Sequence, residues 1–197
     1  MSDRYIETSP QHLSVLCVLR AERTMRLTLC DPTQWFLVIP DLHRALSCAL
    51  VAALQGTAGI GAYGPKLRQR WLEYLEATRT NREVLPPDGD KVESFTELLQ
   101  RVQVPSPELR GDPLLLTAQQ LEDLHKLNVL RGDIEHVKPA SWFLEVAGLP
   151  RICRAAAYAL GHLYNLPPLF IHLEEPELES GRRAVENILN FNFQTKA

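Results

Sequence analysis

The sequence predicts an all-α protein, an antiparallel bundle of six or seven helices. Apolar residues recur at three- and four-residue intervals along several stretches, which places one apolar stripe on each helix. No stretch alternates apolar and polar residues reliably enough for a strand, and nothing repeats at a fixed period. Turns rich in proline and glycine join the helical stretches, and helices joined by turns are typical of a bundle.

Length and composition narrow the class further. The 197 residues suit a single domain, 1–197, that can bury a sizeable core. A formal net charge of -3 excludes a broadly basic nucleic-acid-coating protein but allows an enzyme with one local basic cleft. The four cysteines are widely spaced with no metal-ligand cluster, which favours reduced thiols, no bound metal or cofactor, and a cytoplasmic location. We expect no membrane span, because the longest apolar run, 45–54, is short and interrupted.

The first two helices are predicted from residues 9 to 54. Ser9 is a good N-cap and Pro10 suits the first helical position. Residues 35–54 form the most hydrophobic helix, which Pro40 either kinks or divides. The glycines of 56–61 end that helix; with no preceding strand and no GKS or GKT, they are not a phosphate loop.

The middle of the chain is predicted to leave the core. A short amphipathic helix spans 66–79, and another helix spans 91–102. Prolines and polar residues punctuate the stretch between and after them, so residues 80–113 are expected to be a proline-rich helical insertion between core helices.

A long helix beginning near Leu116 carries the most informative residues. Thr117 is its expected N-cap, and Gln120 completes a capping box. Pro139 ends it, Ser141 is expected to open the next helix with Pro150 as a kink, and 177–191 closes the chain.

Arg131 and His136 lie at the end of this helix, five residues and about 140° apart on a helical wheel. Their side chains can still converge on a groove against another helix or a second copy. A guanidinium binds phosphate oxygens through two N–H bonds, and histidine titrates near neutral pH, so the pair suits a phosphodiester. A solvated helix end explains them equally well.

The pattern Leu-Asn-x-Leu-Arg-x4-His over 127–136 resembles the signature of the HEPN superfamily, an arginine followed four to six residues later by a histidine. The alanine-rich helix containing Asp41 to Leu46 is similar to an early helix of that family. The resemblance covers about 35–56 and 116–165. It implies a homodimer through the 116–138 helix, in a bacterial or phage toxin or defence setting. It also implies a metal-independent endoribonuclease in which His136 is the general acid/base and Arg131 stabilises charge on the phosphate.

The sequence departs from the family at Gly132, where a polar residue, often asparagine, is common. Asp133 and Glu135 add negative charge, and both are expected either to orient His136 or to pair with Arg131. These departures favour the alternative, a non-catalytic HEPN-like protein that binds nucleotide or RNA or is only a dimeric scaffold. A helical adaptor unrelated to the family is a third possibility.

Two further residues are candidates for substrate binding. Lys138 adds positive charge near the phosphate, although a lysine at a helix end also complements the helix dipole. It stands where some family members carry a tyrosine that a paired nucleotidyltransferase modifies. Trp142 is expected to stack a base or to anchor the next helix to the core. His43 and His125 are alternatives as polar contributors to the cleft or as satisfied, partly buried histidines.

Overall fold

The computed structural model describes residues 8–109, 111–136, 139, 141–166 and 173–193. Within these ranges the chain is all-helical, which confirms the predicted fold class. The elements in order are α1 (Pro10–Leu27), a 3-10 turn (Pro32–Gln34), α2 (Trp35–Leu54), α3 (Pro65–Arg79), α4 (Phe95–Arg101), α5 (Ala118–Glu135), α6 (Leu149–Tyr164) and α7 (Glu175–Leu189).

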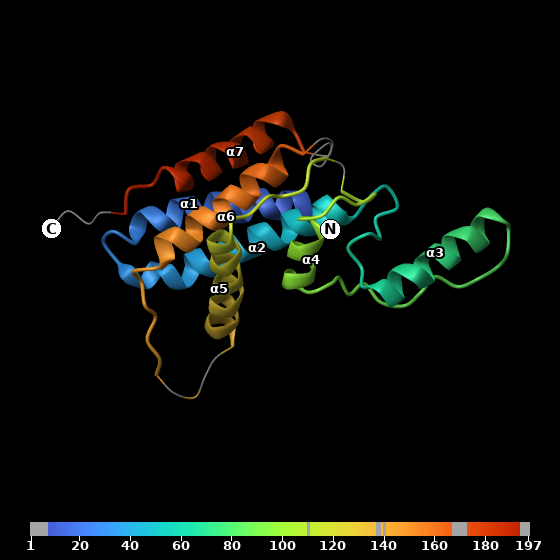
Figure 1. Ribbon diagram of the computed structural model, residues 1–197, viewed down its shortest axis with the longest axis horizontal. Coiled ribbons are helices and arrows are strands. Elements are labelled where there is room, and N and C mark those ends of the chain that lie inside the picture. The colour runs from blue at the N-terminus through green and yellow to red at the C-terminus, as the bar shows by residue number, and fades with distance from the viewer. Residues whose placement is uncertain (1–7, 110, 137–138, 140, 167–172, 194–197) are drawn as a thin grey trace, which may run out of the picture.

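Four helices form the body of the bundle. Helices α1, α2, α6 and α7 lie side by side, and α5 crosses α2 and α6 at a steep angle (Figure 1). Apolar side chains at helical spacing make the core because burying them removes their area from water. The largest that are fully buried are Met25, Ile39, Leu42, Leu46, Leu50, Leu54, Leu98, Leu99, Leu114, Leu124, Leu127 and Tyr164.

Helix α2 is the centre of this core. Its alanines Ala45, Ala49 and Ala53 are buried, and small side chains let α1 and α6 approach closely. The stretch Pro32–Leu54, which contains α2, is long and apolar enough to cross a membrane, but 67% of its apolar 18-residue window is buried inside the protein. Burial to this extent is what a core helix shows. Pro40 lies inside α2 without dividing it.

Capping explains where the helices begin. Ser9 accepts a hydrogen bond from the N–H of His12 and Pro10 starts α1, as predicted. The capping box of Thr117 and Gln120 at the start of α5 is also confirmed.

The prediction for Ser141 is wrong. Residues 141–146 are not helical, and α6 begins at Leu149 with Pro150 in its first turn. Proline has no N–H to donate, and the first helical turn needs none, so Pro150 marks the start of α6 rather than a kink.

The expected insertion, residues 80–113, contains residues that pack in the core. Phe95, Leu98 and Leu99 of α4 belong to the core, where α4 packs on α2. The part that stands away from the bundle is instead α3 (Figure 1), in which Ala77 is the one buried residue. Apolar residues at helical spacing predict a helix with one apolar face. They do not reveal whether that face packs on the core, as in α4, or stands away from it, as in α3.

Candidate functional site

A hydrogen bond beside the apolar stripe of helix α5 holds this helix against α2. Leu124 and Leu127 are fully buried, and the next turn carries Asn128, whose Oδ1 accepts a hydrogen bond from Nε2 of His43 at 2.9 Å. His43 is itself 8% exposed, and its ring packs at a tilt of 32° against the ring of Phe95, with 4.6 Å between the ring centroids. The histidine is therefore a satisfied, buried residue that joins α2, α4 and α5.

The environment of His43 favours its neutral form. Burial lowers the pKa of this imidazole below its ordinary value of 6.5, the hydrogen bond to Asn128 partly opposes the shift, and the nearby Arg131 charge adds to it. A neutral imidazole can donate from Nε2 to the asparagine carbonyl, as the geometry requires.

Arg131 lies one turn beyond this contact, on the side of α5 that faces α2. Its guanidinium forms an ion pair with Glu135, and the other oxygen of Glu135 is 3.8 Å from Nη2 of Arg44 on α2. We call Arg44, Arg131 and Glu135 the arginine cluster. The side chains of Arg131 and Arg44 are 37% and 56% exposed, so both keep access to a ligand. Two cations around one carboxylate leave a net positive charge.

His136 follows the last helical residue of α5. Its backbone N–H donates to the carbonyl of Gly132 at 3.0 Å, but its φ of -94° and ψ of 99° are extended. The 140° separation from Arg131 assumed a continuing helix and therefore does not apply. The imidazole is exposed at the end of α5, where it can meet a ligand or a second copy of the chain.

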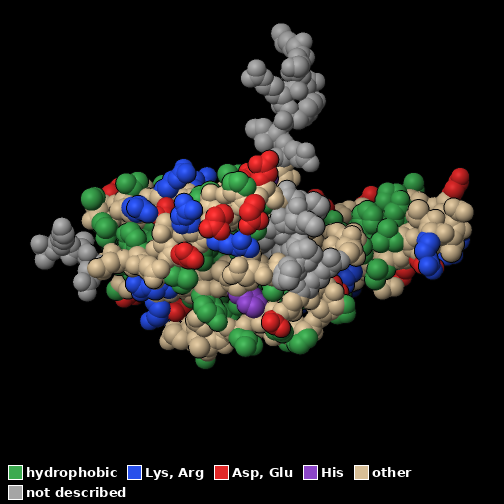
Figure 2. All heavy atoms as spheres, turned by 90° about the horizontal axis from the view of Figure 1, so that it is seen from above, with side chains coloured by type: hydrophobic (Ala, Val, Ile, Leu, Met, Phe, Trp, Pro, Cys, Tyr) green, Lys and Arg blue, Asp and Glu red, His purple; other side chains and the backbone are tan. Residues whose placement is uncertain are grey.

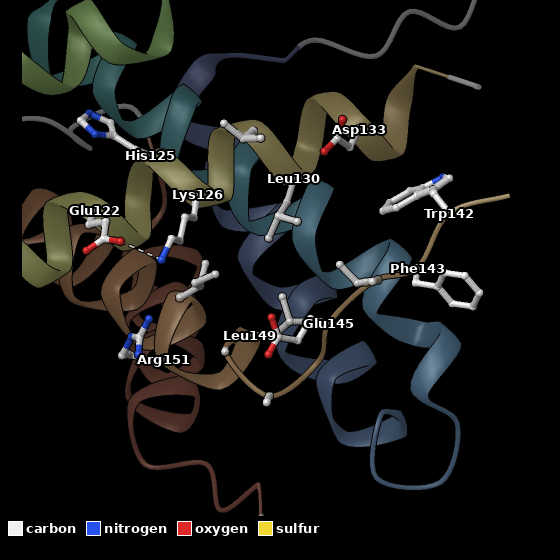
Figure 3. A pocket seen from close by; sticks show the side chains of 15 residues that line it. Glu122, His125, Lys126, Leu130, Asp133, Trp142, Phe143, Glu145, Leu149 and Arg151 are labelled. Atoms are coloured by element: carbon white, nitrogen blue, oxygen red, sulfur yellow. Dashed lines mark ion pairs between the residues drawn. The ribbon is translucent and has the colours of Figure 1, made fainter. Parts of the chain in front are cut away.

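Asp133 and Trp142 belong to a different cavity. They line a pocket of about 780 Å³ between α5 and the segment 142–149, and the two side chains lie at one end of it in Figure 3. Asp133 is two residues from Arg131, hence about 200° around the helix, so the pocket is on the face of α5 turned away from the arginine cluster. Phe143 at its rim points outward and is 98% exposed.

Trp142 also touches α2. Its ring meets the ring of Phe36 edge to face at 5.7 Å, which anchors the segment after α5 to the start of α2. Lys138 lies outside the described residues. The structure thus brings Arg131 together with Arg44 and Glu135. It places Asp133 and Trp142 along one pocket, on a different face of α5.

Two contributors were missed by the sequence analysis. Arg44 lies inside the alanine-rich stretch Asp41 to Leu46 but was not singled out, and the hydrogen bond between His43 and Asn128 was not predicted. The sequence gives no local signal for a hydrogen bond between residues 85 positions apart.

The remaining chemistry is limited in the part of the chain that the structure describes. Burial raises the pKa of Cys48 to about 11 and that of Cys153 to about 12, which makes both thiols poor nucleophiles. No group of three or more metal-ligating side chains occurs among those residues. Acidic and basic side chains are interspersed over the face seen in Figure 2, so positive charge is local rather than broad.

No family model, curated protein or solved structure matches this chain.

Proposed function

We propose that this chain is a HEPN-like, metal-independent endoribonuclease that works as a homodimer. One observation carries the proposal: the arginine cluster lies at the end of the helix that also presents an exposed His136. Guanidinium groups bind phosphate oxygens and histidine transfers protons near neutral pH, so this end of α5 holds the two groups that the reaction needs.

The chemistry is a transesterification within the RNA. The ribose 2′-oxygen attacks the adjacent phosphorus, the bond to the 5′-oxygen breaks, and the products are a 2′,3′-cyclic phosphate and a 5′-hydroxyl. His136 accepts the 2′-hydroxyl proton as general base, and the leaving 5′-oxygen takes a proton from water. Arg131 and Arg44 stabilise the charge that grows on the non-bridging oxygens.

The test is incubation of a mixed RNA pool with the protein in EDTA. Wild type is expected to cleave it and leave 2′,3′-cyclic phosphate ends, whereas Arg131→Ala and His136→Ala are expected to be inactive. Cleavage by all three proteins would place the activity elsewhere and contradict the proposal.

A second candidate is a non-catalytic HEPN-like protein that binds RNA or nucleotide. Glu135 favours it, because this carboxylate already pairs with Arg131 and lies near Arg44, and so reduces their attraction for phosphate. Gly132 favours it too, since it offers no side chain to the site. Binding of RNA without cleavage, by a folded dimer, would support this alternative over the first.

A further inference from the structure

A second pocket adjoins the arginine cluster on the surface of α1 and α2. It has a volume of about 370 Å³, and its lining includes Arg20 of α1 and Phe36, Pro40, Asp41 and Arg44 of α2. Phe36, Pro40 and Arg44 are four residues apart in turn, so they share one face of the helix. Phe36 and Arg44 are two turns apart, about 12 Å along the axis.

Arg44 makes the two regions continuous. It lines this pocket and also lies 3.8 Å from Glu135, which pairs with Arg131. A ligand bound to Arg131 therefore reaches the α1–α2 pocket by passing Arg44.

The pocket combines cations with an aromatic face. Arg20 and Arg44 have side chains that are 62% and 56% exposed, and Phe36 is 38% exposed. The T-shaped contact with Trp142 holds the Phe36 ring in place. Arginines alternating with an aromatic ring are the features by which proteins bind single strands, with phosphates on the cations and bases stacked on the ring.

The negative charge of Asp41 does not remove the affinity of this pocket for phosphate. The carboxylate is 5% exposed, and both of its oxygens accept hydrogen bonds from Nε and Nη2 of Arg20. Its charge is compensated by that paired contact, which also fixes the guanidinium plane. Nη1 of Arg20 takes no part in this pair with Asp41, so its two N–H groups can donate to a phosphate.

We propose that the α1–α2 pocket is a nucleotide subsite for single-stranded RNA, with Phe36 stacking a base and Arg44 and Arg20 binding the flanking phosphates. This inference rests on the proposed function, because it extends the strand that Arg131 holds. Duplex RNA is disfavoured, since its bases are not splayed out to meet the ring.

The test measures binding of a fluorescent, fully 2′-O-methylated single-stranded oligonucleotide across a series of salt concentrations. The methyl groups block attack by the 2′-oxygen, so binding is separated from cleavage. Arg44→Gln is expected to weaken binding and to reduce the slope of log K against log salt by about 0.7, the loss of one phosphate contact. Phe36→Leu is expected to weaken binding about tenfold with the slope unchanged, and Phe36→Tyr is expected to retain affinity.

Matched controls exist on other faces. Arg183→Gln replaces an exposed arginine on α7, and Phe143→Leu replaces a phenylalanine outside this pocket. Both are expected to bind like wild type, and thermal melts check that every variant is folded.

The outcomes separate the two claims. Normal binding by Phe36→Leu and Arg44→Gln, with binding lost in Arg131→Ala, would overturn the subsite while leaving the proposed function standing. An equal loss in the controls, or an equal effect of Phe36→Leu on duplex RNA, would also overturn the subsite. No binding by wild type would overturn both.

Discussion

The hydrogen bond from Nε2 of His43 to Oδ1 of Asn128 joins the middle of α2 to the helix that carries Arg131. This hydrogen bond helps to fix how α5 packs on α2, and it lies one turn before Arg131. The position of the arginine cluster thus depends on a hydrogen-bonded pair, the buried His43 and the half-buried Asn128, that is not itself part of the proposed site.

Replacing Asn128 by alanine is expected to leave a buried N–H of His43 without a partner. The cost of such a group is about 1–3 kcal/mol in the free energy of unfolding. Urea denaturation measures it, with Asn190→Ala, an exposed asparagine at the end of α7, as the control that changes stability by less than about 0.5 kcal/mol. Equal losses in the two variants would show that the hydrogen bond between His43 and Asn128 contributes no more to stability than an exposed asparagine does.

The free energy of unfolding is expected to decrease as the pH is lowered, because of His43. Its folded pKa is lowered, so the unfolded chain binds the proton more tightly than the folded one. The full stability is present above the ordinary pKa of 6.5, and it decreases as pH falls through that value toward the folded pKa. Urea midpoints across this range should decline less in His43→Gln than in wild type. Parallel curves would contradict the assignment.

Gly132→Ala is expected to stabilise the protein. Gly132 lies inside α5, nothing lies within 4 Å of an added Cβ, and alanine is favoured over glycine in a helix by about 1 kcal/mol. Gly61→Ala is the contrasting variant, because its Cβ would collide with the carbonyl oxygen of Leu54 and is expected to destabilise the fold strongly. Melting temperatures that move in the same direction for both would contradict this reasoning.

Glu135→Gln is expected to strengthen RNA binding. The change removes the negative charge next to Arg131 and Arg44, and the salt dependence of binding should become steeper. Glu122→Gln is a matched control, since Glu122 pairs with Lys126 at 2.8 Å on the opposite face of the same helix. If Glu135→Gln instead weakened binding, Glu135 would have to act by orienting the arginines rather than by opposing the phosphate.

The sequence predicted the helices well where local rules determine them. Ser9 with Pro10 and Thr117 with Gln120 satisfy backbone donors within their own turn, so their roles can be read without knowing the rest of the fold. Ser141 is also a good N-cap residue, but no continuous apolar stripe follows it. The helix begins only at Leu149, with Pro150 in its first turn.

Tertiary placement could not be predicted in the same way. The stripes of α3 and α4 look alike in sequence, yet α4 is buried on α2 and α3 stands apart. Asp133 was grouped with Arg131 because the two are close in sequence. Two residues that are two positions apart on a helix face opposite sides. The pocket forms on the Asp133 side because the segment 142–149 packs there, which the sequence of α5 alone does not reveal.

The central claim is that two copies build one catalytic site, and mixing inactive variants tests it most directly. Arg131→Ala and His136→Ala, each inactive alone, are combined under conditions where subunits exchange, and cleavage in EDTA is followed. The account predicts that activity returns in the mixture, because a mixed dimer supplies one Arg131 and one His136 to the shared cleft. No activity after exchange has been verified by mass, beside an active wild type, would contradict a shared site.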